Sequence, residues 1–383
     1  MEDKGKQLNS SNIPQDICKM MMKCDDVDLA LISKAYEFAK EAHKEHKRLS
    51  GEPYLNHLVS TAINLAHIKA DAKTVSAGLL HDTLEDTKTK EEEILTNFGD
   101  EILFLIKGVT KLGKIKYQGA ERHAESLRKL FMATAKDIRV LLIKLADRLN
   151  NIETLESLFK VRPEKAKRIA LETLEIYAPI ANRLGMGQMR GALEDGSFPY
   201  VYPAEYKKTI ELRQTKSKKL LEDLEKLNRT LVKNLVKAGI TKFRTDFRIK
   251  HLYSLFQKLQ RYNMNIDQIY DISALRVIVP KTEDCYQVLG IIHNIFKPFP
   301  ERLKDYIAMP KPNGYQSIHT VVFTGEGTIA EIQIRSEAMH EEAEFGITSH
   351  LFYDEAGKPK TGGKLTKQLK WIKKLIEWQK TVH

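Results

Sequence analysis

Helical spacing of apolar residues dominates the first half of the chain. From Val27 to about Leu193 they recur every three or four positions, as at Leu29, Ile32 and Tyr36. Strand-like alternation is scarce over the same stretch. The pattern therefore predicts a helical N-terminal half.

A long charged helix is predicted from Glu205 to Ala238, with Gly239 at a position typical of a helix end. It follows the proline-bracketed aromatic segment FPYVYP, which we expect to form a turn at a domain boundary. One face of the helix is apolar, which predicts a connector packed by that face. That face carries Leu220, Leu224, Leu227, Leu231 and Leu235.

Beyond Gly239 the pattern changes to alternation. The segment from Asp271 to Val279 is rich in strand formers, and in TIAEIQIR the polar Glu331 and Gln333 alternate with apolar residues. Helices near Leu252 to Leu259 and Tyr286 to Ile295 are expected to cover the resulting sheet. A flexible stretch, DEAGKPKTGGK, precedes a last predicted helix that ends WIKKLIEWQK. The second half is thus predicted to be α/β.

Length and charge narrow the class of protein only partly. The 383 residues predict two or three domains, and the formal charge of +11 suits polyphosphates, RNA or an acidic partner equally well. No apolar run is long enough to span a bilayer, and the polar N-terminus has no export signal. We therefore expect a cytoplasmic protein without membrane contact.

The segment VSAGLLHDTLEDT carries the first candidate chemistry. In a helix, His81 would lie above Glu85 and Asp82 above Asp86, so that two carboxylate layers share a face. A His-Asp pair is a usable pair of metal ligands, and a Glu-Asp pair one turn later can activate water. A solvated acidic face is the simpler alternative for this motif alone.

Two further residues favour a metal site. His57 lies in SGEPYLNH at the start of a predicted helix, and Asp147 lies in LLIKLADRLNN, a helix with strongly apolar faces. A carboxylate there needs a partner, because burial of an unpaired charge is costly. Together with the His-Asp pair they form a four-ligand set that suits a divalent metal. Core histidines with a capping aspartate remain the alternative.

Four motifs in this half resemble the HD hydrolase domain of the Rel/SpoT family: GEPYLNH, LLHDTLEDT, GVTKLGK and KLADRLNN. The resemblance implies that manganese is bound by His57, His81, Asp82 and Asp147. It also implies that Glu85 and Asp86 manage the attacking water. The nucleotide contacts that it implies are Arg48, Ser50, Asn151 and Thr154.

Three positions depart from the family pattern. Leu49, Asn150 and Glu153 stand where Lys, His and Arg are usual. These departures affect the expected affinity more than the chemistry, because every ligand and both catalytic carboxylates are present. We therefore expect a working hydrolase.

The second half concentrates cations around two carboxylates, Asp271 and Glu331. Cations cradle phosphates, and carboxylates on neighbouring strands can bind Mg²⁺. No P-loop or kinase glycine loop is present. Solvated surface charge is the alternative for each basic residue taken singly.

Three segments resemble the Rel/SpoT synthetase domain: DISALRVIV, RLKDYIAMPKPNGYQSIHTVVF and EIQIRSEAMHEEAEFG. The resemblance implies Mg²⁺ on Asp271 and Glu331, with Glu331 drawing the proton from the 3′-hydroxyl of GDP or GTP. That hydroxyl attacks the β-phosphorus of ATP and releases AMP. Arg248 and Arg276 would sandwich adenine, and Tyr315 would stack on guanine. The remaining nucleotide contacts would be Lys250, Lys258, Arg302, Lys304, Lys311, Asn313 and His319.

The resemblance covers nearly the whole chain and implies a bifunctional alarmone enzyme that makes and hydrolyses (p)ppGpp, with ATP, GDP or GTP as its other ligands. Arg302 and Lys304 fit the RxKD pattern of bifunctional members. The expected fold is α+β and multidomain, with an all-α HD-type hydrolase domain, a helical connector and an α/β mixed-sheet, nucleotidyltransferase-like synthetase domain. The expected bounds are an N-terminal segment 1–26, hydrolase 27–198, connector 199–239 and synthetase 240–383.

Two other functions remain open. One is a hydrolase whose synthetase fold only senses nucleotide. The other is a basic RNA-binding or ribosome-binding module, which explains the charge but leaves two sets of carboxylates unexplained. The C-terminal regulatory domains of longer family members do not follow in this sequence, so contact with the ribosome or tRNA is not predicted.

Overall fold

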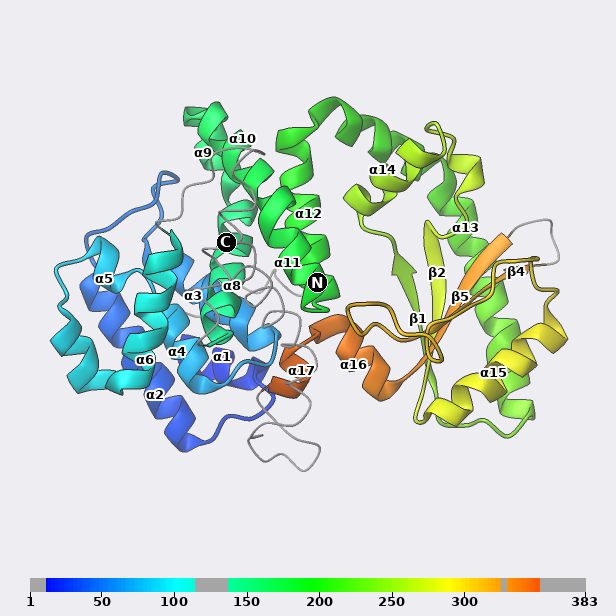
Figure 1. Cartoon of the computed structure of the whole chain (residues 1–383), viewed down its shortest axis with the longest axis horizontal. Helices are drawn as coiled ribbons and strands as arrows, with labels where there is room; N and C mark the ends of the chain where they lie inside the picture. The colour runs from blue at the N-terminus through cyan, green and yellow to red at the C-terminus, as the bar shows by residue number, and fades with distance from the viewer. Residues whose placement is uncertain (1–11, 114–136, 325–328, 352–383) are drawn as a thin grey trace, which may run out of the picture. The chain divides into compact units, whose positions relative to one another are not determined.

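The computed structural model describes residues 12–113, 137–324 and 329–351, and the chain divides into two compact units (Figure 1). The first unit comprises residues 1–177 with 347–383, and the second comprises residues 178–346. The predicted domain bounds stay predictions. Among the described helices, none combines the length and apolarity that crossing a membrane requires.

The first unit is built from helices, as its apolar spacing predicts. Helices α2, α3, α4, α6 and α8 pack on one another around a core of aliphatic side chains. Gly99, with φ of 83°, kinks α6. The elements are α1 Ile13–Met20, α2 Asp26–Ala42, α3 Leu55–His67, α4 Ala72–Leu80, α5 Thr83–Asp86, α6 Glu91–Gly113, α8 Arg139–Glu153, α9 Leu155–Val161, α10 Pro163–Glu172, the π-helix η2 Thr173–Tyr177 and α17 Thr348–Leu351.

The VSAGLLHDTLEDT segment belongs to two helices, whereas we predicted one. His81 and Asp82 form a turn between α4 and α5. The His81 ring nitrogen Nδ1 donates to the carbonyl of Gly78, 2.8 Å away. That carbonyl would accept from the Asp82 amide if the helix continued, so the side chain replaces a backbone hydrogen bond.

The second unit contains a five-stranded mixed sheet in the order β1-β2-β5-β4-β3, which confirms the predicted α/β half. Strands β2 and β5 are parallel, and the other pairs are antiparallel. The elements are α11 Ala178–Arg183, α12 Gly187–Val201, α13 Pro203–Lys237, β1 Arg244–Ile249, α14 Leu252–Arg261, the 3₁₀ helix η3 Ile266–Gln268, β2 Ser273–Val279, α15 Thr282–Ile295, β3 Lys304–Asp305, β4 Ile318–Phe323, β5 Ile329–Ser336 and α16 Glu337–Phe345.

Helices α13 and α15 cover one face of this sheet (Figure 1). The predicted leucine face of α13 packs against β2, β4 and β5, with Leu224, Leu231 and Leu235 fully buried. Gly239 follows with φ of 82°, as expected at a helix end. Helix α14 does not cover the sheet as predicted: its Leu255 and Leu259 belong to a separate cluster with residues of α13. The last predicted helix lies outside the described residues.

The predicted aromatic turn is reduced to a single residue. Pro199 lies inside α12, only Tyr202 is non-helical, and Pro203 is the first residue of α13. The aromatic rings stabilise this junction, since the ring of Phe198 stacks on that of Phe256, with centroids 5.0 Å apart.

Helices α12 and α14 approach closely where α14 begins. The carboxylate of Asp195 accepts from the Tyr253 amide and from His251 Nδ1, both at 2.9 Å, and so caps α14 from a neighbouring helix. A β-carbon on Gly191 would lie 2.1 Å from the His251 ring. The absence of a side chain at this position therefore permits the contact.

Candidate metal centre and nucleotide-binding face

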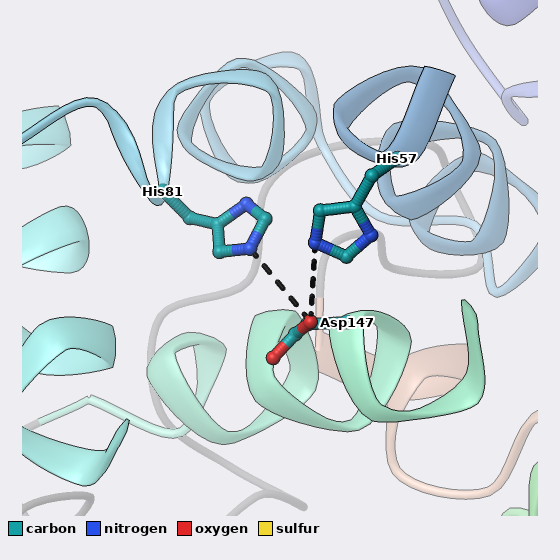
Figure 2. A group of neighbouring side chains, drawn as sticks. All are labelled: His57, His81 and Asp147. Atoms are coloured by element: carbon teal, nitrogen blue, oxygen red, sulfur yellow. Dashed lines mark ion pairs between the residues drawn. The ribbon is translucent and has the colours of Figure 1, made fainter. Parts of the chain in front are cut away.

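The four predicted metal ligands of the first unit meet around Asp147. The carboxylate oxygen Oδ1 of Asp147, on α8, lies 3.3 Å from His57 Nε2 and 3.9 Å from His81 Nε2 (Figure 2). Asp82 Oδ2 lies 3.5 Å from His57 Nε2 and 3.1 Å from His81 Nε2. Helix α3 and the α4–α5 turn thus bring both imidazoles to one carboxylate of α8.

Both imidazoles are oriented by their other ring nitrogen. His57 Nδ1 donates to Asn150 Oδ1 at 2.6 Å, and His81 Nδ1 donates to Gly78 O. These bonds turn Nε2 of each ring towards Asp147 and Asp82 as the candidate ligand atom, as is usual for metal-binding histidines. His81 Nε2 is buried and makes no hydrogen bond within the described residues, despite its short distance to Asp82. His57, His81 and Asp147 therefore form a set that fits a divalent metal ion, and Asp82 lies within 3.5 Å of both imidazoles.

Charge inside this centre is balanced by cations. Burial opposes ionisation of Asp147, but Lys144, which donates to Oδ2 at 2.7 Å, and the imidazoles hold its pKa well below the usual value. Burial likewise disfavours a charged His57, yet its bonds to Asp147 and Asp82 raise its pKa to about 9. Positive charge is thus favoured at the point where the ligand atoms converge.

The predicted water-managing carboxylates, Glu85 and Asp86, lie exposed on α5 beside this centre. Tyr54, which sequence reasoning missed, donates its hydroxyl to Asp82 Oδ2 at 2.7 Å. Burial and the charges of Asp82 and Asp86 raise the pKa of Tyr54, so the phenol stays protonated and donates. Its ring stacks on His43, with centroids 5.1 Å apart.

Three of the four predicted nucleotide contacts of this unit lie together. Arg48 donates from Nη2 to Asn151 Oδ1 at 2.6 Å, and from Nη1 to Thr154 Oγ1 at 3.1 Å and Asn150 Oδ1 at 3.0 Å. Ser50 is exposed in the following loop, next to the exposed Leu49. Asn150, singled out as a departure, therefore contacts both Arg48 and His57.

The candidate site of the second unit occupies the sheet face opposite α13 and α15. Strand register aligns Arg276 with Gln333, Gln333 with His319 and His319 with Lys304 across four strands. Glu331, two residues before Gln333, lies on the same face because side chains alternate along a strand. A row of polar side chains therefore crosses the sheet.

Both predicted magnesium ligands are paired with side chains that favour their ionised form, Asp271 with two lysines and Glu331 with an imidazole. Asp271 binds Lys250 and Lys258, whose ammonium groups outweigh the effect of burial and lower its pKa to about 2. Glu331 lies 3.0 Å from His319 Nδ1 and accepts from Gln333 Nε2 at 2.8 Å. Burial would raise the pKa of Glu331, but His319 lowers it, so the group is an ionised carboxylate.

The aromatic residues form a second part of this face. The hydroxyl of Tyr315 lies 2.8 Å from His319 Nε2, and the ammonium of Lys311 lies 4.8 Å from the Tyr315 ring centre. Lys311 also lies 4.6 Å from the ring centre of Tyr306. Arg248 donates to Gln333 at 3.3 Å. The aromatic rings and cations that the sequence singled out thus converge near Glu331.

Other predicted contacts point elsewhere. Asn313 donates to the carbonyl of Asn182 at 3.0 Å, and Arg302 is exposed ahead of β3. Arg276 pairs with Glu344 at 3.2 Å, and the same carboxylate binds the buried Arg335 at 2.9 Å. Sequence reasoning did not assign Glu344 a role. Arg276 and Arg335 lie on different strands, so their positions in the sequence do not predict that both pair with Glu344.

Two family models match successive parts of the chain. An HD domain matches residues 35–187, and the region found in RelA/SpoT proteins matches residues 247–358. The first range contains all four residues of the candidate metal centre, and the second contains both carboxylates of the sheet site.

Curated relatives match almost the whole chain. A guanosine-3′,5′-bis(diphosphate) 3′-pyrophosphohydrolase of Aquifex aeolicus is 47% identical over 90% of this chain and 48% of its own length. A GTP pyrophosphokinase of Myxococcus xanthus is 43% identical, with coverage of 92% and 46%. The bifunctional (p)ppGpp synthase/hydrolase SpoT of Escherichia coli is 41% identical, with coverage of 98% and 51%. The chain spans about half the length of these relatives.

Proposed function

The chain belongs to the Rel/SpoT family, and from this premise we propose that it is a bifunctional alarmone enzyme. One activity transfers pyrophosphate from ATP to the 3′-hydroxyl of GDP or GTP, and the other removes the 3′-pyrophosphate of (p)ppGpp. The observation that carries this proposal is that one chain holds two separate acidic centres, each surrounded by cations or imidazoles. The relatives with hydrolase, pyrophosphokinase and bifunctional names support both activities.

Hydrolysis is assigned to the first unit. His57, His81, Asp82 and Asp147 would hold a manganese ion, which lowers the pKa of water and polarises a phosphoryl oxygen. Glu85 and Asp86, exposed on α5, take the proton of the attacking water. Arg48, Ser50, Asn151 and Thr154 bind the nucleotide, with the guanidinium fork suited to a phosphate.

Synthesis is assigned to the second unit. Asp271 and Glu331 would hold a magnesium ion, which neutralises charge on the transferring group. Glu331 takes the proton of the 3′-hydroxyl as that oxygen attacks the β-phosphorus of ATP, and AMP leaves. Arg248 and Arg276 sandwich adenine, and Tyr315 stacks on guanine. The phosphates are bound by Lys250, Lys258, Lys304, Lys311 and His319, and Arg302 and Asn313 are further nucleotide contacts.

The two activities are tested separately. The protein is incubated with ATP, GDP and magnesium, then with guanosine tetraphosphate and manganese, and nucleotides are resolved by anion-exchange chromatography. We expect guanosine tetraphosphate with AMP in the first reaction, and GDP with pyrophosphate in the second. Hydrolysis without synthesis would instead assign a sensing role to the second unit. Salt-dependent RNA binding with neither activity would overturn the proposal.

A further inference from the structure

Asn150 serves two functional side chains with one oxygen atom. Its Oδ1 accepts from His57 Nδ1 at 2.6 Å and from Arg48 Nη1 at 3.0 Å. Asn150 is 4% exposed, so little water reaches this oxygen to compete with the two donors. Asn150 is therefore bonded both to a candidate metal ligand, His57, and to a candidate nucleotide contact, Arg48.

A second asparagine makes a parallel connection. Asn151 Oδ1 accepts from Arg48 Nη2 at 2.6 Å, while its amide nitrogen donates to Asp147 Oδ1 at 2.6 Å. Both asparagines lie on α8, which also carries Asp147. Through them, Arg48 is linked to a histidine ligand and to a carboxylate ligand of the same centre.

Because His57 and Arg48 donate to the same oxygen of Asn150, they compete for it as an acceptor. A strong bond from Nδ1 to an acceptor fixes the imidazole and raises the basicity of Nε2, which strengthens metal binding. The guanidinium of Arg48 is always charged and donates a hydrogen bond to the same oxygen, Asn150 Oδ1. An anionic group that binds Arg48 would draw the guanidinium from Oδ1 and leave this oxygen to His57.

We propose that Asn150 is a positioning residue that couples divalent-metal binding at His57 to anion binding at Arg48, so that each binding event strengthens the other. If the bound anion strengthens metal binding, then the bound metal must strengthen anion binding by the same factor, because the two sites share one coupling free energy. The anion half of the coupling rests on the proposed function, which makes Arg48 a nucleotide contact. The orientation of His57 by Asn150 does not depend on it.

The first experiment measures the Mn²⁺ affinity of the full chain without nucleotide, from the spin-resonance signal of free Mn²⁺. Asn150→Leu removes the acceptor at similar volume and is expected to weaken binding about 10–100-fold. Asn150→Asp keeps an acceptor oxygen and is expected to bind at least as tightly as the original protein. Wild-type affinity in Asn150→Leu, or equal losses in both variants, would overturn the proposal.

Asn64→Leu is the matched control. Asn64 is a buried asparagine on α3 that donates to the Ala146 carbonyl at 3.2 Å, so its replacement also removes a buried bond between α3 and α8. We expect unchanged Mn²⁺ affinity, because the bond that is lost goes to a backbone carbonyl and not to a ligand side chain. Thermal unfolding of each variant distinguishes loss of the site from loss of the fold.

The coupling is isolated by combining Arg48→Ala with Asn150→Leu. Arg48→Ala is expected to tighten Mn²⁺ binding when Asn150 is present and to have a smaller effect when it is absent. An equal effect in both backgrounds would mean simple charge repulsion and would overturn the coupling. These measurements use no substrate, so a protein that shows the coupling but hydrolyses no guanosine tetraphosphate would contradict only the proposed function.

Discussion

Single residues explain how buried carboxylates persist in both units. Asp147 is paired with Lys144, Asp271 with two lysines, and Glu331 with His319. An unpaired carboxylate at these depths would protonate or destabilise the fold. Each carboxylate is therefore ionised and can exchange its present partner for a metal ion or a substrate proton.

Replacing Glu331 by Gln tests its proposed role as the base of the synthetase reaction. The amide is of similar size but cannot take a proton, so the synthesis rate should fall by about 10²–10⁴-fold. The rate of AMP formation from ATP and GDP gives the measurement, and hydrolysis of guanosine tetraphosphate by the same preparation is the control. Retained synthesis would remove Glu331 from this role.

His43 should make the protein sensitive to mild acid. Burial lowers its pKa from 6.5 to about 4, so the unfolded chain binds more protons between these values. Stability should therefore decrease as pH falls from 6.5 towards 4, by at most about 3 kcal/mol from this group.

The variant His43→Phe keeps a ring against Tyr54 but cannot titrate. Its free energy of unfolding, measured by urea titration, should depend less on pH over this range. His67→Gln, at an exposed position at the end of α3, is the control. An unchanged pH dependence in His43→Phe would refute the assignment.

The chemically distinctive residues could be identified from the sequence, but their partners could not. His81 and Asp82 are adjacent in a recognisable motif, and their use as ligands follows from chemistry alone. Glu344 and Tyr54 take part only because the fold brings distant segments together. Asn150 was visible as a departure, yet its two contacts span about a hundred residues in sequence and need the packed structure.

At the scale of elements, periodicity predicted the helical first half, helix α13 and strands β2 and β5, but not the interruptions of the helices. The α4–α5 turn arises from a side chain that replaces a backbone bond, which a hydrophobic pattern does not record. Similarly, Pro199 does not end α12, because the packing of Phe198 and its neighbours stabilises the junction. A local side-chain bond interrupts the helix in the first case, and tertiary packing outweighs the local propensity of proline in the second.

The buried face of α13 should dominate the stability of the second unit. Leu231 is fully buried in the sheet core, so Leu231→Ala should lower the free energy of unfolding by about 2–5 kcal/mol. Val236, on the same helix and 53% exposed, is the comparison, with an expected change below about 0.5 kcal/mol for Val236→Ala. Equal effects in urea unfolding would contradict the packing described.

At the scale of the whole molecule, the chain joins two units that each contain an acidic centre. The units divide between Tyr177 and Ala178, within the span of the matched HD model. Composition gave no sign of this division, because no proline-rich or glycine-rich linker separates the two. The two units are therefore defined by contacts within each part of the chain and not by a linker that the sequence reveals.

The two proposed reactions oppose each other and together predict a futile cycle when both metals are supplied. With ATP, GDP, magnesium and manganese, the protein should accumulate AMP and pyrophosphate while guanosine tetraphosphate stays low. Glu85→Gln should lower hydrolysis by about 10²–10⁴-fold and let the tetraphosphate accumulate. Time courses of all the nucleotides give the measurement. An unchanged product balance in this variant would argue against the role of Glu85.

The contact between α12 and α14 limits the sequences that this fold accepts over evolution. A β-carbon at position 191 would push His251 away from Asp195 and uncap α14, so relatives with this contact should keep glycine there. Positions 195 and 251 should change together, since each serves the other. A family tree would then show paired substitutions at these two sites, with position 191 almost invariant.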